Sequence, residues 1–184
     1  TGEPVSAGVK ASLAADFDKK LFYINSLMST YDPQSEISRF NKLESGQCQA
    51  ISAETQAVID RSKILYAKTE GAFDPTVGPL VNLWGFGAGR RINNPPDPEH
   101  VAVASQKTGF RSIKQGCEAG GLLKEKALEI DFSAIAKGFA VDYLSDWLVD
   151  EGYRNHLVEI GGEIKALGQA PSGEAWRVAI ERPS

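Results

Sequence analysis

Three short segments combine glycine, proline and charged residues in patterns that suit ligand binding. The first covers residues 71–80 and reads GAFDPTVGPL. Its glycines allow a ligand to approach the backbone closely, its prolines stiffen the loop, and Asp74 offers a fixed hydrogen-bond acceptor. These features predict a site for the polar edge of a heteroaromatic ring. An ordinary Asp-Pro turn followed by a buried loop would give the same local pattern.

The second segment, residues 131–138, reads DFSAIAKG and joins a predicted strand to a predicted helix. The N-terminus of a helix attracts anions, of which phosphate is a common example, and Lys137 would add positive charge beside it. The alternative is that Ser133 only caps the helix, Asp131 offsets the helix dipole and Lys137 is solvated. The segment lacks the GxxxxGK[ST] pattern, so it is not a P-loop of that type.

The third segment, residues 159–164, reads EIGGEI and places Gly161 and Gly162 inside a strand pattern. Such a glycine pair indicates a bulge or a ligand lying against bare backbone, and a plain hairpin turn is an equal alternative. Residues 85–89, GFGAG, resemble a dinucleotide fingerprint only superficially, because they neither follow a strand nor open a helix. They are predicted to form a loop.

Cysteine and histidine residues are too few and too scattered to predict a zinc or redox site. Cys48 and Cys117 belong to no CxxC motif, so they are either two isolated thiols or one bridge. His100 and His156 are the only histidines, which leaves a histidine triad poorly supplied. Any metal would therefore be a hard cation held by oxygen atoms.

Hydrophobic periodicity predicts the helices that position these segments. Apolar residues recur every three or four positions from Leu13 to Leu27, which indicates a core-packing helix. Ser52 and Asp97 are predicted helix caps, with Pro98 at a first helical position where a missing N–H costs nothing. The predicted helices cover residues 12–30, 52–69, 97–109 and 134–151.

The remaining chain predicts strands and irregular loops. Short apolar runs broken by glycines predict two or three antiparallel strands within residues 112–132, and further strands at residues 156–160, 164–167 and 176–180. Residues 71–98 are too rich in glycine and proline to form one regular element. The fold class is therefore α+β, with mixed or antiparallel sheets packed with helices.

Composition excludes some classes of function. The 184 residues are 42% hydrophobic and carry a formal net charge of -4, which predicts one soluble domain over residues 1–184 and no nucleic-acid partner. Nowhere do about 18 apolar residues run together, as a membrane helix would require. The chain begins without a methionine, so a signal or lipid anchor before Thr1 stays possible.

Taken together, these segments resemble one family, the ApbE-type FAD:protein FMN transferases. The matching phrases span most of the chain: residues 29–31 (STY), 36–41 (EISRFN), 69–80 (TEGAFDPTVGPL), 83–87 (LWGFG), 130–142 (IDFSAIAKGFAVD), the glycine pair at 161–162 and 176–180 (WRVAI). Each phrase is weak alone, but their order and wording are specific. The resemblance implies an ApbE-like, T-fold-like architecture, here incomplete.

The resemblance also implies which residues bind FAD and a metal. Ala134 is expected to bind Mg2+ through its backbone carbonyl oxygen, since an alanine side chain has no ligand atom. The other metal ligands, an Asp and a Thr, are expected beyond Ser184, and an opening strand before residue 1. No catalytic side chain is assigned. The expected FAD-binding residues are Tyr31, Asn41, Ala72, Phe73, Asp74, Asp131, Lys137, Gly161 and Gly162.

The implied activity is the Mg2+-dependent transfer of FMN from FAD to a Thr or Ser hydroxyl of an acceptor protein, with release of AMP. The alternatives are an FAD pyrophosphatase, in which water replaces the hydroxyl, and a flavin-binding module without catalysis. The family also implies acceptors among the flavoprotein subunits of membrane redox complexes. It implies a periplasmic location, with a possible lipid anchor to the inner membrane.

Overall fold

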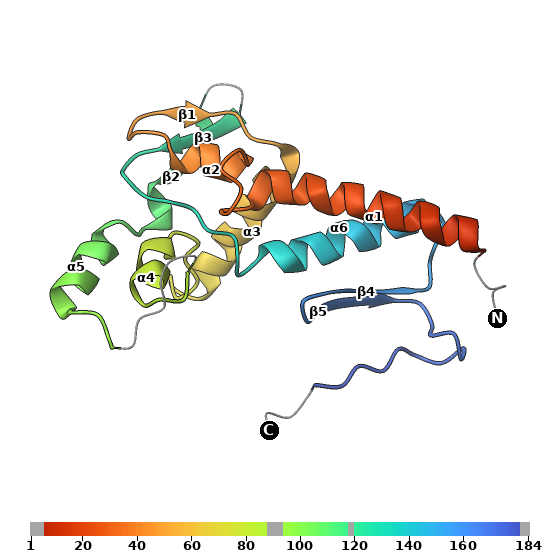
Figure 1. The fold of residues 1–184 in the computed structure, drawn as a ribbon. Coiled ribbons are helices and arrows are strands. Elements are labelled where there is room, and N and C mark those ends of the chain that lie inside the picture. Colours follow the sequence, from red (N-terminus) through yellow and green to blue (C-terminus); the bar gives the residue numbers. More distant parts are fainter. Residues whose placement is uncertain (1–5, 88–93, 118–119, 181–184) are drawn as a thin grey trace. The chain divides into compact units, whose positions relative to one another are not determined.

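The computed structural model describes residues 6–87, 94–117 and 120–180. The chain divides into two compact units: a large unit, Tyr23–Ala136, and a small unit that combines Thr1–Phe22 with Lys137–Ser184. Helix α1 (Ala7–Met28) begins in the small unit and ends in the large one. The prediction of a single domain stays a prediction. The α+β class is confirmed by helices and small antiparallel sheets within both units (Figure 1).

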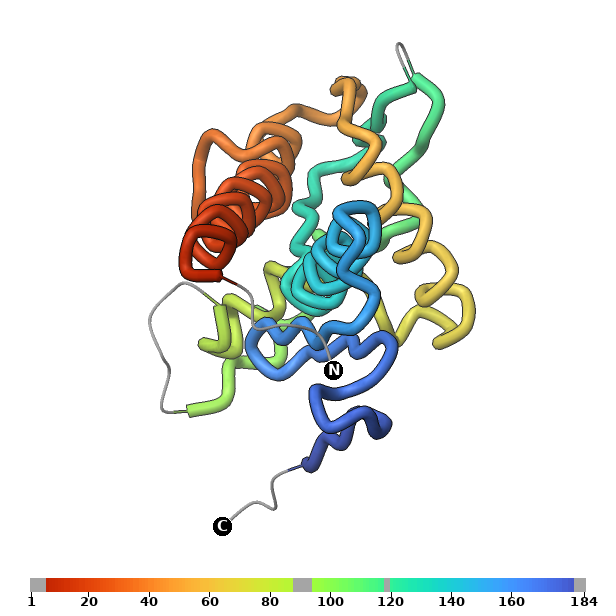
Figure 2. Tube along the Cα trace, turned by 90° about the vertical axis from the view of Figure 1, so that its right-hand side faces the viewer, coloured from red at the N-terminus to blue at the C-terminus, as the bar shows by residue number. Residues whose placement is uncertain are grey.

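The helices of the large unit begin and end largely where local signals place them. After α1 come α2 (Glu36–Asn41), α3 (Ala53–Lys68), α4 (Gly78–Leu83) and α5 (Pro98–Gln106), and the chain can be followed through them in Figure 2. The predicted caps are confirmed, because Ser52 accepts a hydrogen bond from the Thr55 amide and Asp97 accepts one from the Glu99 amide. Helices α2 and α4 are not predicted, since six residues are too few to show a helical period.

A three-stranded antiparallel sheet lies in the large unit, in the order β1-β3-β2. Its strands are β1 (Cys48–Gln49), β2 (Ile113–Cys117) and β3 (Gly121–Lys124). The prediction of two antiparallel strands within residues 112–132 is confirmed. The third strand that the sequence allowed in this range is not formed by the described residues. The Ile130 backbone is hydrogen-bonded to the Asn41 side chain, and the Asp131 amide donates to the Pro75 carbonyl. Strand β1 is not predicted, because it has only two residues.

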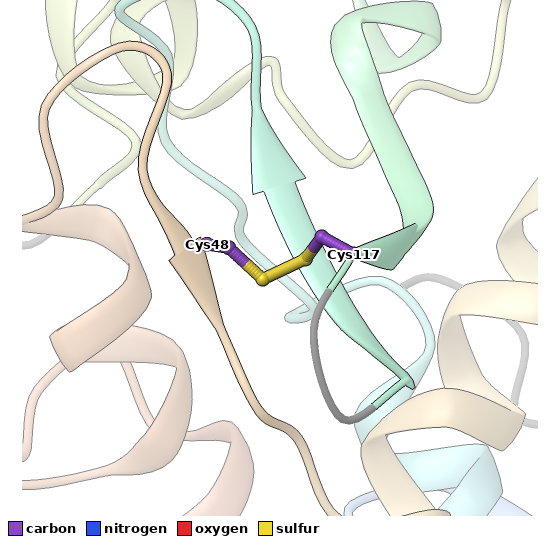
Figure 3. The surroundings of a disulfide bond; sticks show 2 residues. All are labelled: Cys48 and Cys117. Carbon is purple, nitrogen blue, oxygen red and sulfur yellow. A yellow bond between two sulfur atoms is a disulfide. The ribbon is translucent and has the colours of Figure 1, made fainter.

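The two cysteines form a disulfide, which resolves the choice left open by their spacing. Cys48 lies in β1 and Cys117 at the end of β2, so the bond joins the two strands that flank β3 (Figure 3). Gly121 is the register partner of Cys117, and a Cβ atom added to it would lie 2.1 Å from the Gln49 carbonyl oxygen. The close packing of β1 on β3 therefore requires glycine at this position.

The core of the large unit is formed by apolar side chains from helices, strands and loops. Removal of this apolar surface from water is the main favourable term in its folding. Ile130 and Phe132 are almost fully buried although they belong to no strand, so the core also fixes the segment that joins β3 to the next helix. The buried set includes Ile24, Leu27, Met28, Ile37, Phe40, Val58, Ile59, Phe110, Ile113, Leu122, Leu128, Ile130 and Phe132.

The small unit packs helix α6 (Ala136–Asp150) against a hairpin of β4 (His156–Ile160) and β5 (Glu163–Leu167). Its core contains Val141, Leu144, Leu148 and Val158, and the rings of Phe17 and Trp147 meet edge to face with centroids 5.0 Å apart. The predicted strands at 156–160 and 164–167 are confirmed. No described helix of either unit has the length and apolar character needed to cross a bilayer.

Two predictions about the small unit and its junction are wrong. Ser133 is not a helix cap, because α6 begins at Ala136 and the Ser133 hydroxyl donates to Asp131 Oδ1. Residues 176–180 form no strand in the described part of the chain, and the Trp176 indole donates to the Leu167 carbonyl instead. Of the glycine-rich segment at residues 85–89, positions 85–87 form a loop as predicted, and 88–89 lie outside the described residues.

Candidate functional site

A cavity of about 640 Å3 opens in the large unit between three loop segments. One segment joins α1 to α2, the second runs from residue 72 into α4, and the third covers residues 129–134. Each segment contains a phrase of the sequence resemblance. The lining residues are Thr30, Tyr31, Pro33, Ser38, Asn41, Lys42, Ala72, Phe73, Asp74, Pro75, Val77, Gly78, Val81, Asn82, Phe86, Gly87, Glu129, Ile130, Asp131, Ser133 and Ala134.

Most of the predicted site residues lie in the wall of this cavity. These are Tyr31, Asn41, Ala72, Phe73, Asp74, Asp131 and Ala134. The other three belong to the small unit and are gathered at its hairpin turn. There Lys137 Nζ pairs with Glu163 at 2.8 Å and donates to the Gly161 carbonyl at 3.3 Å.

The hairpin turn at Gly161 and Gly162 is the second of the two alternatives drawn from the sequence. Both glycines have positive φ angles, 57° and 96°, and they connect Ile160 to Glu163 across the end of the hairpin. Left-handed backbone of this kind favours glycine for conformational reasons alone. The hydrogen bond from Lys137 lowers the pKa of the Glu163 carboxyl below its ordinary value. A role of these residues in ligand binding stays a prediction.

Asp74 holds its own loop together and also lines the cavity. Its Oδ1 accepts from the Thr76 amide at 2.7 Å and from the Thr76 hydroxyl at 2.6 Å. From the described residues its Oδ2 accepts only one longer bond, 3.3 Å, donated by the Phe110 amide. The Asp-Pro turn offered as the ordinary explanation therefore exists, but it leaves one carboxylate oxygen with spare acceptor capacity at the cavity.

Asn41 fixes the opposite wall by pairing with the main chain. Its side-chain nitrogen donates to the Ile130 carbonyl and its side-chain oxygen accepts from the Ile130 amide, both at 2.8 Å. These two hydrogen bonds satisfy the Ile130 backbone as a neighbouring strand would, although the segment around Ile130 belongs to no sheet. Because one lone pair and one N–H remain on the amide, direct contact with a ligand stays a prediction.

Asp131 stands where the walls meet. Its amide donates to the Pro75 carbonyl at 2.7 Å, which ties the third segment to the second. Its Oδ1 accepts from the amide of Ser133 at 2.8 Å and from the hydroxyl of the same residue. Among the described residues, Asp131 Oδ2 has no hydrogen-bond partner, so it can accept from a ligand or bind a cation.

Aromatic side chains lie around the cavity with their rings available for stacking. Tyr31 is 72% exposed and Phe86 is 83% exposed, while Phe73 is half-buried. Exposed rings beside a cavity suit a planar ligand. Phe86 is absent from the predicted site residues, although its position between Gly85 and Gly87 in the matching phrase LWGFG was a signal that could have found it.

The buried side chain of Lys124 contacts Asn41, which is one of the residues that line the cavity. Lys124 is 3% exposed, and its side-chain ammonium donates to the Asn41 carbonyl at 2.8 Å, at the C-terminal end of α2. A positive charge is favourable there because it opposes the helix dipole. Burial lowers the pKa of Lys124, and the nearby Glu129 carboxylate opposes this shift only in part.

Oxygen atoms near Ala134 are of the type that Mg2+ prefers, but they are few. The described residues contain no group of three or more His, Cys, Asp or Glu side chains placed to hold a metal. Asp131 Oδ2 and the main-chain oxygen of Ala134 are hard donors at the cavity wall. The donor chemistry therefore fits Mg2+, provided that phosphate, water or other protein oxygens complete the coordination.

Comparison with known proteins assigns the family. The ApbE family model matches residues 2–184, so the chain belongs to the ApbE family. The FAD:protein FMN transferase of Vibrio cholerae is 42% identical over 174 residues, and that of Haemophilus influenzae is 41% identical over 165 residues. These matches cover 94% and 88% of this chain, but the chain spans only about half of each relative, 52% and 48%.

Solved structures agree with this assignment. The flavin transferase ApbE of Vibrio cholerae superposes with a TM-score of 0.89 at 40% identity, over 99% of this chain and 58% of that one. The apo form of the flavinyl transferase ApbE of Pseudomonas stutzeri gives a TM-score of 0.87 at 36% identity, over 98% and 58%. The expected ApbE-like architecture is thereby confirmed.

Proposed function

We propose that the protein containing this chain transfers FMN from FAD to a Thr or Ser hydroxyl of an acceptor protein in a Mg2+-dependent reaction that releases AMP. The observation that carries the proposal is the cavity that brings Tyr31, Asp74, Asp131 and Ala134 together from distant parts of the chain. The names of the relatives, FAD:protein FMN transferase, support it.

The residues of the cavity would bind and orient FAD. Tyr31 and Phe86 offer ring faces for the flavin or adenine, and Asp74 Oδ2 offers an acceptor for a ring N–H. Asp131 and Ala134 lie at the turn where the diphosphate would bind. The buried Ile130 side chain beside them gives this part of the cavity wall an apolar residue.

The chemical step needs little from side chains. The acceptor oxygen forms a bond to the phosphorus on the FMN side of the diphosphate, the bond from that phosphorus to the bridging oxygen breaks, and AMP leaves as the acceptor hydroxyl loses its proton. Such phosphoryl transfers are accelerated mainly by alignment and charge neutralisation. Bound Mg2+ would supply the neutralisation of the phosphate oxygens. The chain would supply the alignment.

Mass spectrometry of three products tests the proposal with the whole natural protein. Incubation with FAD, Mg2+ and an acceptor should give acceptor heavier by FMN, together with AMP. Free FMN and AMP without labelled acceptor would instead identify an FAD pyrophosphatase. Tight FAD binding without AMP would identify a binding module.

A matched pair of variants links the activity to the cavity. Asp74→Asn keeps the shape of the side chain and removes its charge, and it should lower labelling. Asp150→Asn makes the same change at an exposed position at the end of α6 and should leave labelling unchanged. Equal labelling by both variants would refute the placement of FAD in this cavity.

We also propose that the protein works in the periplasm, with a possible lipid anchor, on flavoprotein subunits of membrane redox complexes. The disulfide between Cys48 and Cys117 supports an oxidising compartment, because such bonds are rare in the cytosol. Fractionation of cells that make the natural protein, with rapid alkylation of free thiols, tests this. Reduced protein in the cytosolic fraction would overturn the proposal.

A further inference from the structure

Thr76 is a fully buried polar residue directly behind the cavity wall. Its relative exposure is 0%, and both its amide and its hydroxyl are hydrogen-bonded. The hydroxyl donates to Asp74 Oδ1 at 2.6 Å and accepts from the Gly109 amide at 2.7 Å. The sequence did not single out Thr76, and it does not line the cavity itself.

The direction of each hydrogen bond follows from the atoms involved. An amide can only donate and a carboxylate can only accept, so the single hydroxyl proton must point at Asp74. The chain of donors therefore runs from Gly109 through Thr76 to Asp74 Oδ1. Gly109 has a φ angle of 129°, a conformation that favours glycine, and in it the Gly109 amide meets the hydroxyl.

The two carboxylate oxygens of Asp74 are hydrogen-bonded to different extents. Oδ1 is held by two short bonds from Thr76, whereas the 3.3 Å contact from the Phe110 amide is the only one that Oδ2 makes with the described part of the chain. A carboxylate held by one oxygen loses little rotational freedom when its other oxygen binds a ligand, so the entropic cost of binding falls.

We propose that Thr76 is a positioning residue, which orients the Asp74 carboxylate so that Oδ2 accepts a hydrogen bond from a ring N–H of the bound dinucleotide. The inference rests on the proposed function, in which FAD occupies this cavity. A purely structural role would affect stability alone. A positioning role requires that the effect on ligand affinity pass through Asp74.

The test is a double-mutant cycle on FAD affinity in the whole natural protein. Thr76→Val keeps the shape and removes the hydroxyl, and Thr76→Ser keeps the hydroxyl. We expect Thr76→Val to weaken FAD binding about tenfold, as the loss of a hydrogen bond to a charged group implies. Thr76→Ser should stay within about twofold of the wild type, a difference below 0.5 kcal/mol or so.

Coupling to Asp74 separates positioning from structure. Once Asp74→Asn has removed the charged acceptor, adding Thr76→Val should weaken FAD binding little further. Dissociation constants are measured by flavin fluorescence below the melting temperature of every variant, and circular dichroism checks folding. If Thr76→Val does not fold, Thr76→Cys, which keeps a weak donor, takes its place, and FAD binding about threefold weaker is expected.

Four results of these measurements would overturn the positioning role of Thr76, and one of them would also overturn the proposed function. Folded Thr76→Val that binds FAD as the wild type does, or effects of the two substitutions that multiply, would overturn the positioning role and leave the proposed function standing. Wild-type affinity in Asp74→Asn would overturn it too, because FAD binding would then not depend on the charged acceptor that Thr76 is proposed to orient. A wild-type protein that binds no FAD would overturn both proposals.

Discussion

Loss of the disulfide between Cys48 and Cys117 should destabilise the large unit by about 4 kcal/mol. The bond closes a loop with a sequence separation of 69 residues, so it removes many conformations from the unfolded chain. The chain-entropy relation gives about 4 kcal/mol for a loop of this length. Strand β1 has only two paired residues, and backbone hydrogen bonds from Lys124 to residues 46 and 47 continue its pairing with β3.

Urea unfolding of the oxidised chain and of the double variant Cys48→Ser and Cys117→Ser measures this difference. For a urea dependence of about 2 kcal/mol per molar, the midpoint should fall by about 2 M. Dithiothreitol should shift the midpoint of the wild-type chain by a similar amount. The double variant is the control, because reductant should leave its midpoint unchanged.

Equal midpoints for the oxidised chain and the double variant would refute the reasoning. That result would mean that the unfolded chain is already compact around these strands, or that the sheet does not depend on the covalent link. If dithiothreitol lowered the urea midpoints of the wild-type chain and the double variant equally, the shift would not come from the disulfide, and the reasoning would again be contradicted.

Three further predictions concern the packing around the cavity. Asn41→Asp keeps the acceptor for the Ile130 amide but sets a carboxylate against the Ile130 carbonyl, so we expect a loss of about 1–3 kcal/mol in urea unfolding. Gly121→Ala places a methyl group against the β1 backbone and should cost about 1–3 kcal/mol, whereas Gly138→Ala, with open space around its Cβ, should cost nothing. Burial lowers the pKa of Lys124 in the folded chain below the unfolded value of about 10.4. Between these two pKa values the unfolded chain binds more protons than the folded chain, so the free energy of unfolding should rise with pH there. Urea midpoints across the window should show this rise in the wild type and a weaker one in Lys124→Met.

Local sequence determines most of the extent of the longer helices and the hairpin of this protein, but not the six-residue helices α2 and α4. Ser52 and Asp97 cap their helices as predicted, because a cap involves side chains and amides only a few residues apart. The strands at 156–160 and 163–167 likewise follow from apolar residues on either side of a glycine pair. The family phrases predict that Tyr31, Asp74 and Asp131 share one binding site, and all three line the same cavity.

Only the tertiary structure decides how the cavity is held. The bond from Asn41 to Ile130 joins residues 89 positions apart, and the bond from Gly109 to Thr76 joins residues 33 apart. No local period or cap signal encodes such pairs, because each depends on how the remaining elements pack.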